Sequence, residues 1–182
     1  MLTDTAAIAA TQDWLERAVI GLGLCPFAKA VHVRKQIRYV VTPAESYQEL
    51  LEALAVELRL LDDSDPERID TTLLIHPNIL EDFLDYNWFI ELADDVLEQL
   101  DLVGTLQIAH FHPAFQFEGT VSDDPGNFSN RSPYPMLHLL REDSVERAVA
   151  AFPDAASIYE KNIATLRTLG HEGWIEMWRG KT

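Results

Sequence analysis

Residues 71–113 read TTLLIHPNILEDFLDYNWFIELADDVLEQLDLVGTLQIAHFHP, and this stretch decides the fold. It opens with an apolar run at 71–76 that lacks alternation, which is typical of a strand buried on both faces. A helical pattern over 79–101 follows, and a second apolar strand pattern covers 106–111. A strand, a helix and a strand in this order favour parallel strands joined by a right-handed crossover.

The segments before this stretch extend the same alternation. Residues 4–20 have apolar positions at helical spacing. Residues 31–41 alternate β-branched and basic side chains, which indicates a strand, and residues 44–62 have the pattern of an amphipathic helix. We therefore expect an α/β fold with a small, mainly parallel or mixed sheet, its strands near 31–41, 71–76 and 106–111, flanked by helices.

The segments after residue 131 predict a C-terminal helical part. Ser132 is expected to cap a short helix with Pro133 at its first position. Asp143 is expected to start a second helix that ends at Pro153. A third helix is expected over 155–169, where Asp154 provides the cap and Gly170 the end. The tail, 171–182, either adds an edge strand or packs its tryptophans.

Length and charge limit the class of protein. The 182 residues fit one domain, 1–182, with room for a sizeable core. Residues 45–101 hold 17 acidic side chains and two arginines, and most of the formal net charge of −16 comes from there. Such a chain should avoid nucleic acid and anionic membranes. A single cysteine, the lack of a long apolar run and an acidic residue near the start favour a cytoplasmic protein.

Two histidines mark the ends of predicted strands. His76 and His112 each precede a proline, at the carboxyl edge where open α/β sheets bind ligands. We expect them to act in general acid/base chemistry or to hydrogen-bond a substrate, with His138 in support. The structural alternative is that each one only hydrogen-bonds a loop carbonyl.

A metal site is a weaker alternative at the same place. His110 and His112 are two residues apart and share one face of a strand, so a pair of imidazoles there could bind a metal. Asp123, Asp124, His76 or His138 would complete the site. The spacing lacks a closed set of four ligands. We therefore expect no cofactor and no tightly bound structural metal.

The loop between residues 112 and 132 is too long and too aromatic to be ordinary or disordered. Arg131, at its end, is expected to hold a phosphate or carboxylate. In the alternative, Arg131 pairs with Asp123 or Asp124 and fixes the loop. Asn127 and Asn130 are either turn residues or substrate hydrogen-bonders.

Two further places carry candidate residues. Asp82 and Tyr86 share one face of the predicted helix after His76 and could form a wall of the site, although a cap and a core aromatic explain them equally well. Cys25 precedes a proline, as in one-cysteine redox motifs, but a helix end precedes it where a thioredoxin-like fold needs a strand. We expect a buried or site-lining thiol. The other positions singled out as substrate-binding are Asn87, Tyr134 and Asp124.

Four separated strings, VIGLGLCPFA, HPNILEDFLDYNWF, FHPAFQFEGT and NRSPYPMLHLLRED, resemble a bacterial family catalogued as domain of unknown function 1415. The resemblance spans nearly the whole chain. It implies a small, single-domain, intracellular protein and no established activity. The positions that it marks largely coincide with the candidate residues above, although the family allows another residue at His110, which weakens the metal alternative.

The leading functional hypothesis is an enzyme for a small anionic metabolite, acting by hydrolysis or group transfer at the carboxyl edge of the sheet. The chain lacks a Walker loop and the GxGxxG, GxSxG and HExxH motifs, which argues against several common chemistries. A binding or regulatory module without turnover is the second hypothesis, and a redox protein that uses Cys25 is the third. The sequence leaves the oligomeric state open.

Overall fold

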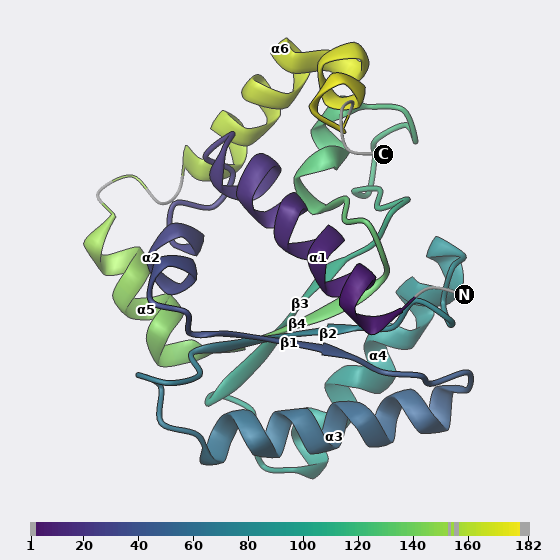
Figure 1. The fold of residues 1–182 in the computed structure, drawn as a ribbon, viewed down its shortest axis with the longest axis vertical. Helices are drawn as coiled ribbons and strands as arrows, with labels where there is room; N and C mark the ends of the chain where they lie inside the picture. The colour runs from purple at the N-terminus through teal and green to yellow at the C-terminus, as the bar shows by residue number, and fades with distance from the viewer. Residues whose placement is uncertain (1–2, 153, 155–156, 179–182) are drawn as a thin grey trace.

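Four strands form one mixed sheet, and helices cover both of its faces (Figure 1). The structure, a computed structural model, describes residues 3–152, 154 and 157–178. Its elements in chain order are α1 (Asp4–Trp14), η1 (Leu15–Ile20), α2 (Ala28–Val33), β1 (Ile37–Val41), α3 (Tyr47–Asp63), β2 (Thr71–Ile75), α4 (Phe83–Gln99), β3 (Leu106–Phe111), η2 (Pro125–Asn130), β4 (Met136–Arg141), α5 (Glu142–Ala151) and α6 (Ile158–Trp178).

The sheet has the strand order β1-β2-β4-β3. β1 is parallel to β2, whereas β4 lies between β2 and β3 and is antiparallel to both. β1, β2 and β3 therefore run in the same direction, and their carboxyl ends share one edge with the start of β4. The α/β class and the mixed sheet are confirmed, and a fourth strand separates the two that were predicted from residues 71–113.

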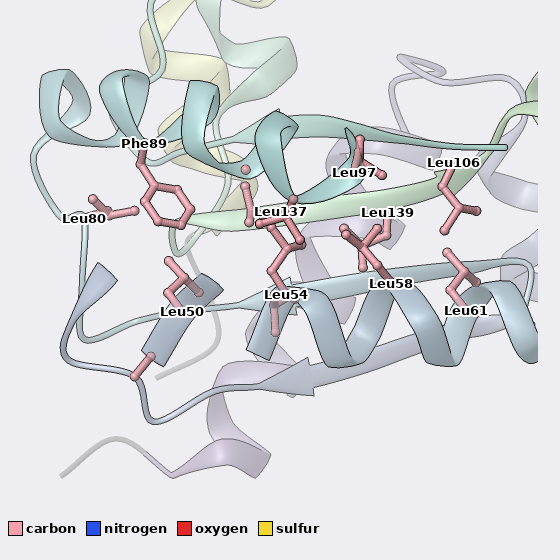
Figure 2. Close-up of a cluster of buried hydrophobic side chains, with 14 of the residues drawn as sticks. Leu50, Leu54, Leu58, Leu61, Leu80, Phe89, Leu97, Leu106, Leu137 and Leu139 are labelled. Carbon is pink, nitrogen blue, oxygen red and sulfur yellow. The ribbon is translucent and has the colours of Figure 1, made fainter. Parts of the chain in front are cut away.

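One core lies between the sheet and the helices α3 and α4 (Figure 2). α3 begins with a capping box in which Ser46 and Glu49 bond to each other's main chain, and Asp82 caps α4. Phe89 and Leu97 point from α4 toward the leucines of α3 and β4. These two helices are where the sequence predicted them, within a few residues.

A second core lies on the opposite face, under α1 and η1. Trp14, Leu15 and Ala18 pack there with Leu73 and Met136. The predicted helix over residues 4–20 is present, but its last six residues form a π-helix. π-Helical segments are rare and often accompany functional sites.

Two of the predicted elements differ in the structure. The strand predicted over 31–41 is present in its second half, as β1, whereas its first residues belong to the short helix α2. Lys35, in a left-handed conformation (φ 59°), lies between the two elements. The helix predicted from Ser132 is absent. The Ser132 hydroxyl donates to the Tyr134 oxygen instead of capping a helix, and the chain enters β4, which β2 and β3 hold from both sides.

The C-terminal part is helical, as predicted, with differences at its end. Gly170 interrupts the last helix with a left-handed φ of 65°, yet the helix resumes and continues to Trp178, so the tail is not an edge strand. Trp174 and Trp178 contact each other there. The predicted helix end at Pro153, the helix start at 155 and the last residues of the tail, 179–182, lie outside the described residues. In the described part of the chain, every helix is too short or too polar to cross a membrane.

Candidate functional site

The two strand-end histidines meet at one aromatic ring. His76 follows β2 and His112 follows β3, and their rings lie 5.9 and 5.0 Å from the ring of Tyr86 on α4. The Tyr86 hydroxyl donates to the Met136 oxygen at 2.9 Å and accepts from the Phe111 nitrogen at 3.2 Å. These three residues therefore lie together at the carboxyl edge of the sheet, but all three are fully buried.

Both ring nitrogens of His112 are in use. The Ala114 main-chain nitrogen donates to Nδ1 at 3.0 Å, so Nε2 carries the proton and donates to the Leu80 oxygen at 3.0 Å. Burial lowers the pKa of His112 and favours this neutral form. In this state the imidazole holds two loop segments together and has no nitrogen left for a substrate.

His76 has one nitrogen without a partner. Nδ1 lies 3.1 Å from the Ile79 oxygen and donates to it, whereas Nε2 is buried and makes no hydrogen bond to the residues that the structure describes. Burial lowers the pKa of His76 to about 4, so its ring is neutral at pH 7. The environment of His76 is apolar and closed to solvent.

His138 lies on the other face of the sheet. Its Nε2 is 2.7 Å from the Thr71 hydroxyl, which donates to the Leu139 oxygen, so the histidine donates to threonine. Desolvation lowers the pKa of His138 to about 4 although its side chain keeps some exposure. His138 contacts Phe111 and the core under α1, so the structure does not bring it together with His76 and His112.

The structure does not assemble the predicted metal alternative either. His110 faces α4, where the Asp94 carboxylate is the nearby charge, and its Nε2 is buried without a partner among the described residues. Across the described part of the chain, no group of three or more His, Cys, Asp or Glu side chains could hold a metal ion. Asp123 is exposed in the long loop and is not grouped with His110 and His112.

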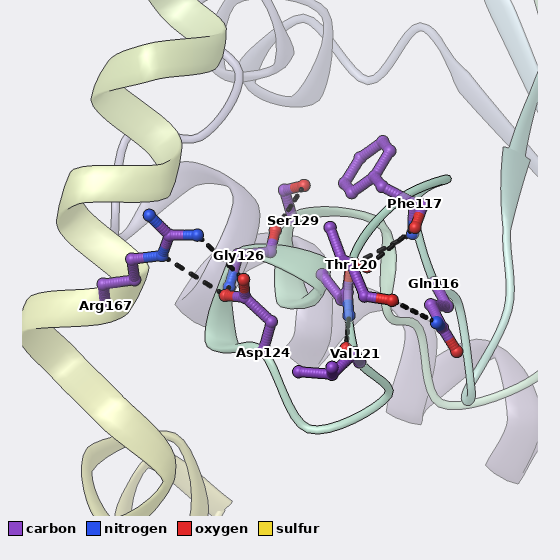
Figure 3. Close-up of polar contacts among 9 residues, drawn as sticks. Gln116, Phe117, Thr120, Val121, Asp124, Gly126, Ser129 and Arg167 are labelled. Carbon is purple, nitrogen blue, oxygen red and sulfur yellow. Dashed lines mark hydrogen bonds and ion pairs between the residues drawn. The ribbon is translucent and has the colours of Figure 1, made fainter.

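Buried amides and one carboxylate organise the long loop. Asn127 is fully buried, and its side chain bonds Phe117, Thr120 and Val121. Asp124 caps η2 through the Gly126 nitrogen at 2.8 Å and pairs with Arg167 of α6 at 2.8 Å (Figure 3). The Arg167 guanidinium lowers the pKa of Asp124. Asn127 thus lies inside η2 and not in a left-handed turn, and its side chain holds the loop together. Asp124 fixes the loop to α6.

Arg131 fixes the same loop, through partners that differ from the predicted ones. Its Nε donates to the Phe115 oxygen at 3.2 Å, its Nη2 donates to the Ser122 oxygen, and the guanidinium lies 5.0 Å from the Phe128 ring centre. The predicted ion pair with Asp123 or Asp124 does not form, because main-chain oxygens accept these bonds and Arg167 holds Asp124. The Asp123 carboxylate acts on Arg131 only as a nearby charge that raises the pKa of the guanidinium.

The remaining predicted residues have structural contacts or face solvent. Asn130 donates to the His110 oxygen at 3.1 Å and so joins the loop to the end of β3. Asp82 caps α4, Asn87 is exposed on α4, and Tyr134 is half-buried against the core under α1. Cys25 is a free, half-buried thiol packed against the same core, three residues before α2 begins.

A cavity of about 430 Å³ lies on the α1 side of the carboxyl edge. It is placed between α1, the residues after β3, the residues before β4, and the end of α6. The Trp14 indole nitrogen donates to the Arg131 oxygen at 2.8 Å and closes one wall. The lining residues are Ala10, Asp13, Trp14, Pro113, Arg131, Ser132, Pro133, Trp174 and Trp178.

Sequence reasoning found Arg131 and this edge of the sheet but missed the tryptophans. The chain has four tryptophans, and three of them line this one cavity. Trp174 and Trp178 are four residues apart in the tail, which would place them on one face of a helix. That spacing could have predicted that Trp174 and Trp178 line one site. No local sequence pattern indicated that Trp14, near the other end of the chain, would join them.

A wider cavity of about 540 Å³ lies beside β1 and α3. Its walls include Val40, Val56 and the glutamates Glu49 and Glu52. Another wall residue, Glu57, is buried and paired with Arg38 at 2.7 Å. None of the predicted site residues lies there, so we take the tryptophan-lined cavity as the candidate site.

These features define an α/β protein with a mixed four-stranded sheet and a tryptophan-lined cavity at the carboxyl edge of its strands. The chain belongs to the family described as protein of unknown function (DUF1415), whose family model matches residues 6–176. No curated protein and no solved structure matches the chain.

Proposed function

We propose that the protein binds a small planar organic anion in the tryptophan-lined cavity, with the ring of the ligand against the indoles and its acidic group on Arg131. The observation that carries this proposal is that the Arg131 guanidinium lacks a carboxylate partner. Among the described residues, Arg131 takes part in no ion pair, and its hydrogen bonds go to neutral main-chain oxygens.

The charge of Arg131 favours an anionic ligand. Burial lowers the pKa of its guanidinium, which means that the charged form has lost part of its solvation, and the nearby Asp123 carboxylate offsets this only in part. Its Nη1 makes no hydrogen bond within the described residues. A carboxylate or phosphate on that nitrogen would form a charge-assisted bond of about 1.5–3 kcal/mol.

The other walls favour a planar ring. Indole rings offer large apolar faces with little conformational freedom to lose, and ligand cavities commonly combine such walls with a few polar groups. The volume, about 430 Å³, falls in the range of about 300–1,000 Å³ that is usual for small-molecule sites. Trp14, at the junction of α1 and the π-helix, is one of these walls.

Binding without turnover is better supported than the enzymatic hypothesis. The lining includes no histidine, and His112 spends both of its ring nitrogens on main-chain atoms. Hydrolysis or group transfer at this cavity would need another base, and the Asp13 carboxylate on its wall is 3.0 Å from Arg17. The redox hypothesis gains no support, because Cys25 is outside the cavity wall.

Calorimetric titration tests the proposal with indole-3-carboxylate, benzoate, inorganic phosphate and the neutral amide indole-3-carboxamide. We expect the aromatic acids to bind, the neutral amide to bind about tenfold or more weakly because it lacks the charge, and phosphate to bind weakly because it lacks the ring. No heat from any aromatic acid at millimolar concentration would reject the proposal.

Indole resonances in a proton–nitrogen correlation spectrum show where the aromatic acid binds. The peaks of Trp174 and Trp178 should move on titration, whereas Trp88, 75% exposed on α4, should not. Arg131→Gln should abolish the shifts, and the matched change Arg34→Gln at an exposed site should leave them intact. Equal movement of the Trp88 peak would indicate unspecific binding.

A further inference from the structure

We propose that the outer face of α4 docks a basic amphipathic helix of a partner protein. Three large apolar side chains on this helix face solvent: Leu84 is 68% exposed, Trp88 75% and Leu92 39%. We refer to these three residues as the α4 ridge. The inference concerns a different surface from the proposed ligand cavity and does not depend on it.

The sequence spacing makes these residues one continuous stripe. They are four positions apart, so they lie above one another on one side of the helix. The opposite side is occupied by Phe89 and Leu97, which point into the core (Figure 2). The exposed stripe is therefore not needed for packing α4 against the core. It spans about 12 Å at 1.5 Å per residue, which matches two turns of a docked helix.

An exposed tryptophan at the centre of such a stripe is typical of a binding surface. Large apolar side chains that stand singly on a surface need no explanation, but contiguous ones mark interaction sites. Tryptophan is among the residues most enriched at the energetic centres of protein interfaces. Trp88 has Leu84 and Leu92 on either side of it and would be the central anchor.

The charges around the ridge determine which partner fits. α4 contains no lysine, arginine or histidine. Within the described residues, none of its carboxylates forms an ion pair. A partner helix with leucines on one face and lysines or arginines beside them would match both the ridge and its surroundings. The exposed acidic residues on or next to the helix are Glu81, Asp82, Asp85, Glu91, Asp94, Asp95, Glu98 and Asp101.

The same negative charges disfavour a second copy of this chain or an anionic membrane as the partner of the α4 ridge. A second copy would place one acidic α4 against another, in a chain whose formal net charge is −16. An anionic membrane surface would be repelled in the same way. A cationic helical peptide satisfies the apolar and the electrostatic requirement together.

The test uses the full chain and two synthetic peptides of about 18 residues, long enough to cover the ridge. Both contain the same leucines and lysines, arranged on one helical face in the first peptide and distributed around the helix in the second. Peptide binding is followed by proton–nitrogen correlation spectra and fluorescence anisotropy at physiological salt. We expect the amphipathic peptide to perturb α4 and the Trp88 indole, and to bind about tenfold or more tightly than its scrambled partner.

Matched variants distinguish binding to the α4 ridge from binding to negative charge alone. Trp88→Ala and Leu84→Ala should each weaken the amphipathic peptide about tenfold. Val56→Ala is the control. Val56 is 61% exposed on α3, a second helix rich in acidic residues, so its replacement should not change peptide binding. All three variants should melt like the parent protein because the changed side chains are exposed.

Four results would overturn the inference. The first is equal binding of the scrambled peptide, and the second is a perturbation map centred on the cavity beside β1 instead of α4. The third is a concentration-dependent dimer that Trp88→Ala dissociates, which would assign the ridge to a second copy. The fourth is Trp88-dependent binding to lipid vesicles, which would assign it to a membrane.

Discussion

The indole nitrogen of Trp14 donates to the main-chain oxygen of Arg131 at 2.8 Å, between positions 117 residues apart in the sequence. This bond joins the end of α1 to the segment that leads into β4. It also sets the distance between two walls of the candidate cavity. Trp14 holds the backbone of Arg131, and the side chain of Arg131 holds the long loop.

Replacing Trp14 should affect stability and the cavity together. Trp14→Phe keeps an aromatic ring but leaves the Arg131 oxygen without its donor. We expect a loss of about 1–2 kcal/mol in the free energy of unfolding, measured in urea, and weaker binding of indole-3-carboxylate. Trp88→Phe serves as the control and should leave both quantities unchanged. Equal stability of the Trp14 variant would show that the bond does not contribute.

Removing one hydroxyl should loosen the edge of the sheet. Tyr86→Phe leaves the Met136 oxygen and the Phe111 nitrogen without their common partner, in a site with no solvent. Two unsatisfied buried groups should cost about 2–4 kcal/mol. Hydrogen exchange should also become faster at the Phe111 amide than at amides of β1. Unchanged exchange at Phe111 would contradict the role given to Tyr86.

The buried histidine His76 should make the fold sensitive to acid. Its pKa is lowered to about 4 in the folded protein, whereas an unfolded histidine titrates near 6.5. The unfolded chain therefore binds the proton first. The stabilisation is complete above about pH 6.5 and is lost as the pH falls toward 4, by up to about 3 kcal/mol.

A variant isolates this contribution from the many carboxylates. His76→Leu should be less stable than the parent at neutral pH, because the Ile79 oxygen loses its donor. Its stability should fall less between about pH 6.5 and 4.5, the interval in which the unfolded parent binds the extra proton. Urea unfolding of both proteins across this interval measures the difference. Parallel pH profiles would show that His76 is not the group responsible.

Arg131 should have two separable effects. Arg131→Ala removes the bonds to the Phe115 and Ser122 oxygens, so we expect a loss of about 1–3 kcal/mol in unfolding free energy as well as loss of anion binding. Asp123→Ala should preserve anion binding and should lower stability less than Arg131→Ala does, because Asp123 accepts no hydrogen bond from Arg131 and acts on it only through its nearby charge. Thermal melts with and without indole-3-carboxylate measure both effects. An Asp123 variant destabilised as much as the Arg131 variant would restore the carboxylate alternative.

The parts of the fold that could be predicted are those whose signal is local. The apolar run of β2 and the helical pattern of α4 agree with the structure because burial selects their residues directly. β4 was missed because Ser132 and Pro133 look locally like a helix start. Its strand conformation comes from hydrogen bonding to β2 and β3, which are distant in the sequence.

In the candidate site, too, the features with a local sequence signal could be predicted and those that depend on packing could not. The two His-Pro steps correctly indicated the carboxyl edge, since strand ends are visible in a sequence. Which side chains are closed off there depends on packing, and His76 and His112 are fully buried. Trp14 and Trp174 line one cavity with Arg131 only after α1 and α6 have packed, so no local sequence pattern relates them.

The position of β4 constrains the order in which the sheet can form during synthesis. β1 and β2 can pair as soon as both have left the ribosome. Among the described residues, however, β4 is the only strand that pairs with β3, and β4 ends at Arg141. Until then, one edge of β2 and both edges of β3 present unpaired backbone groups, which invite pairing with other chains. A nascent chain halted before residue 136 should therefore aggregate, and one extended past β4 should stay soluble.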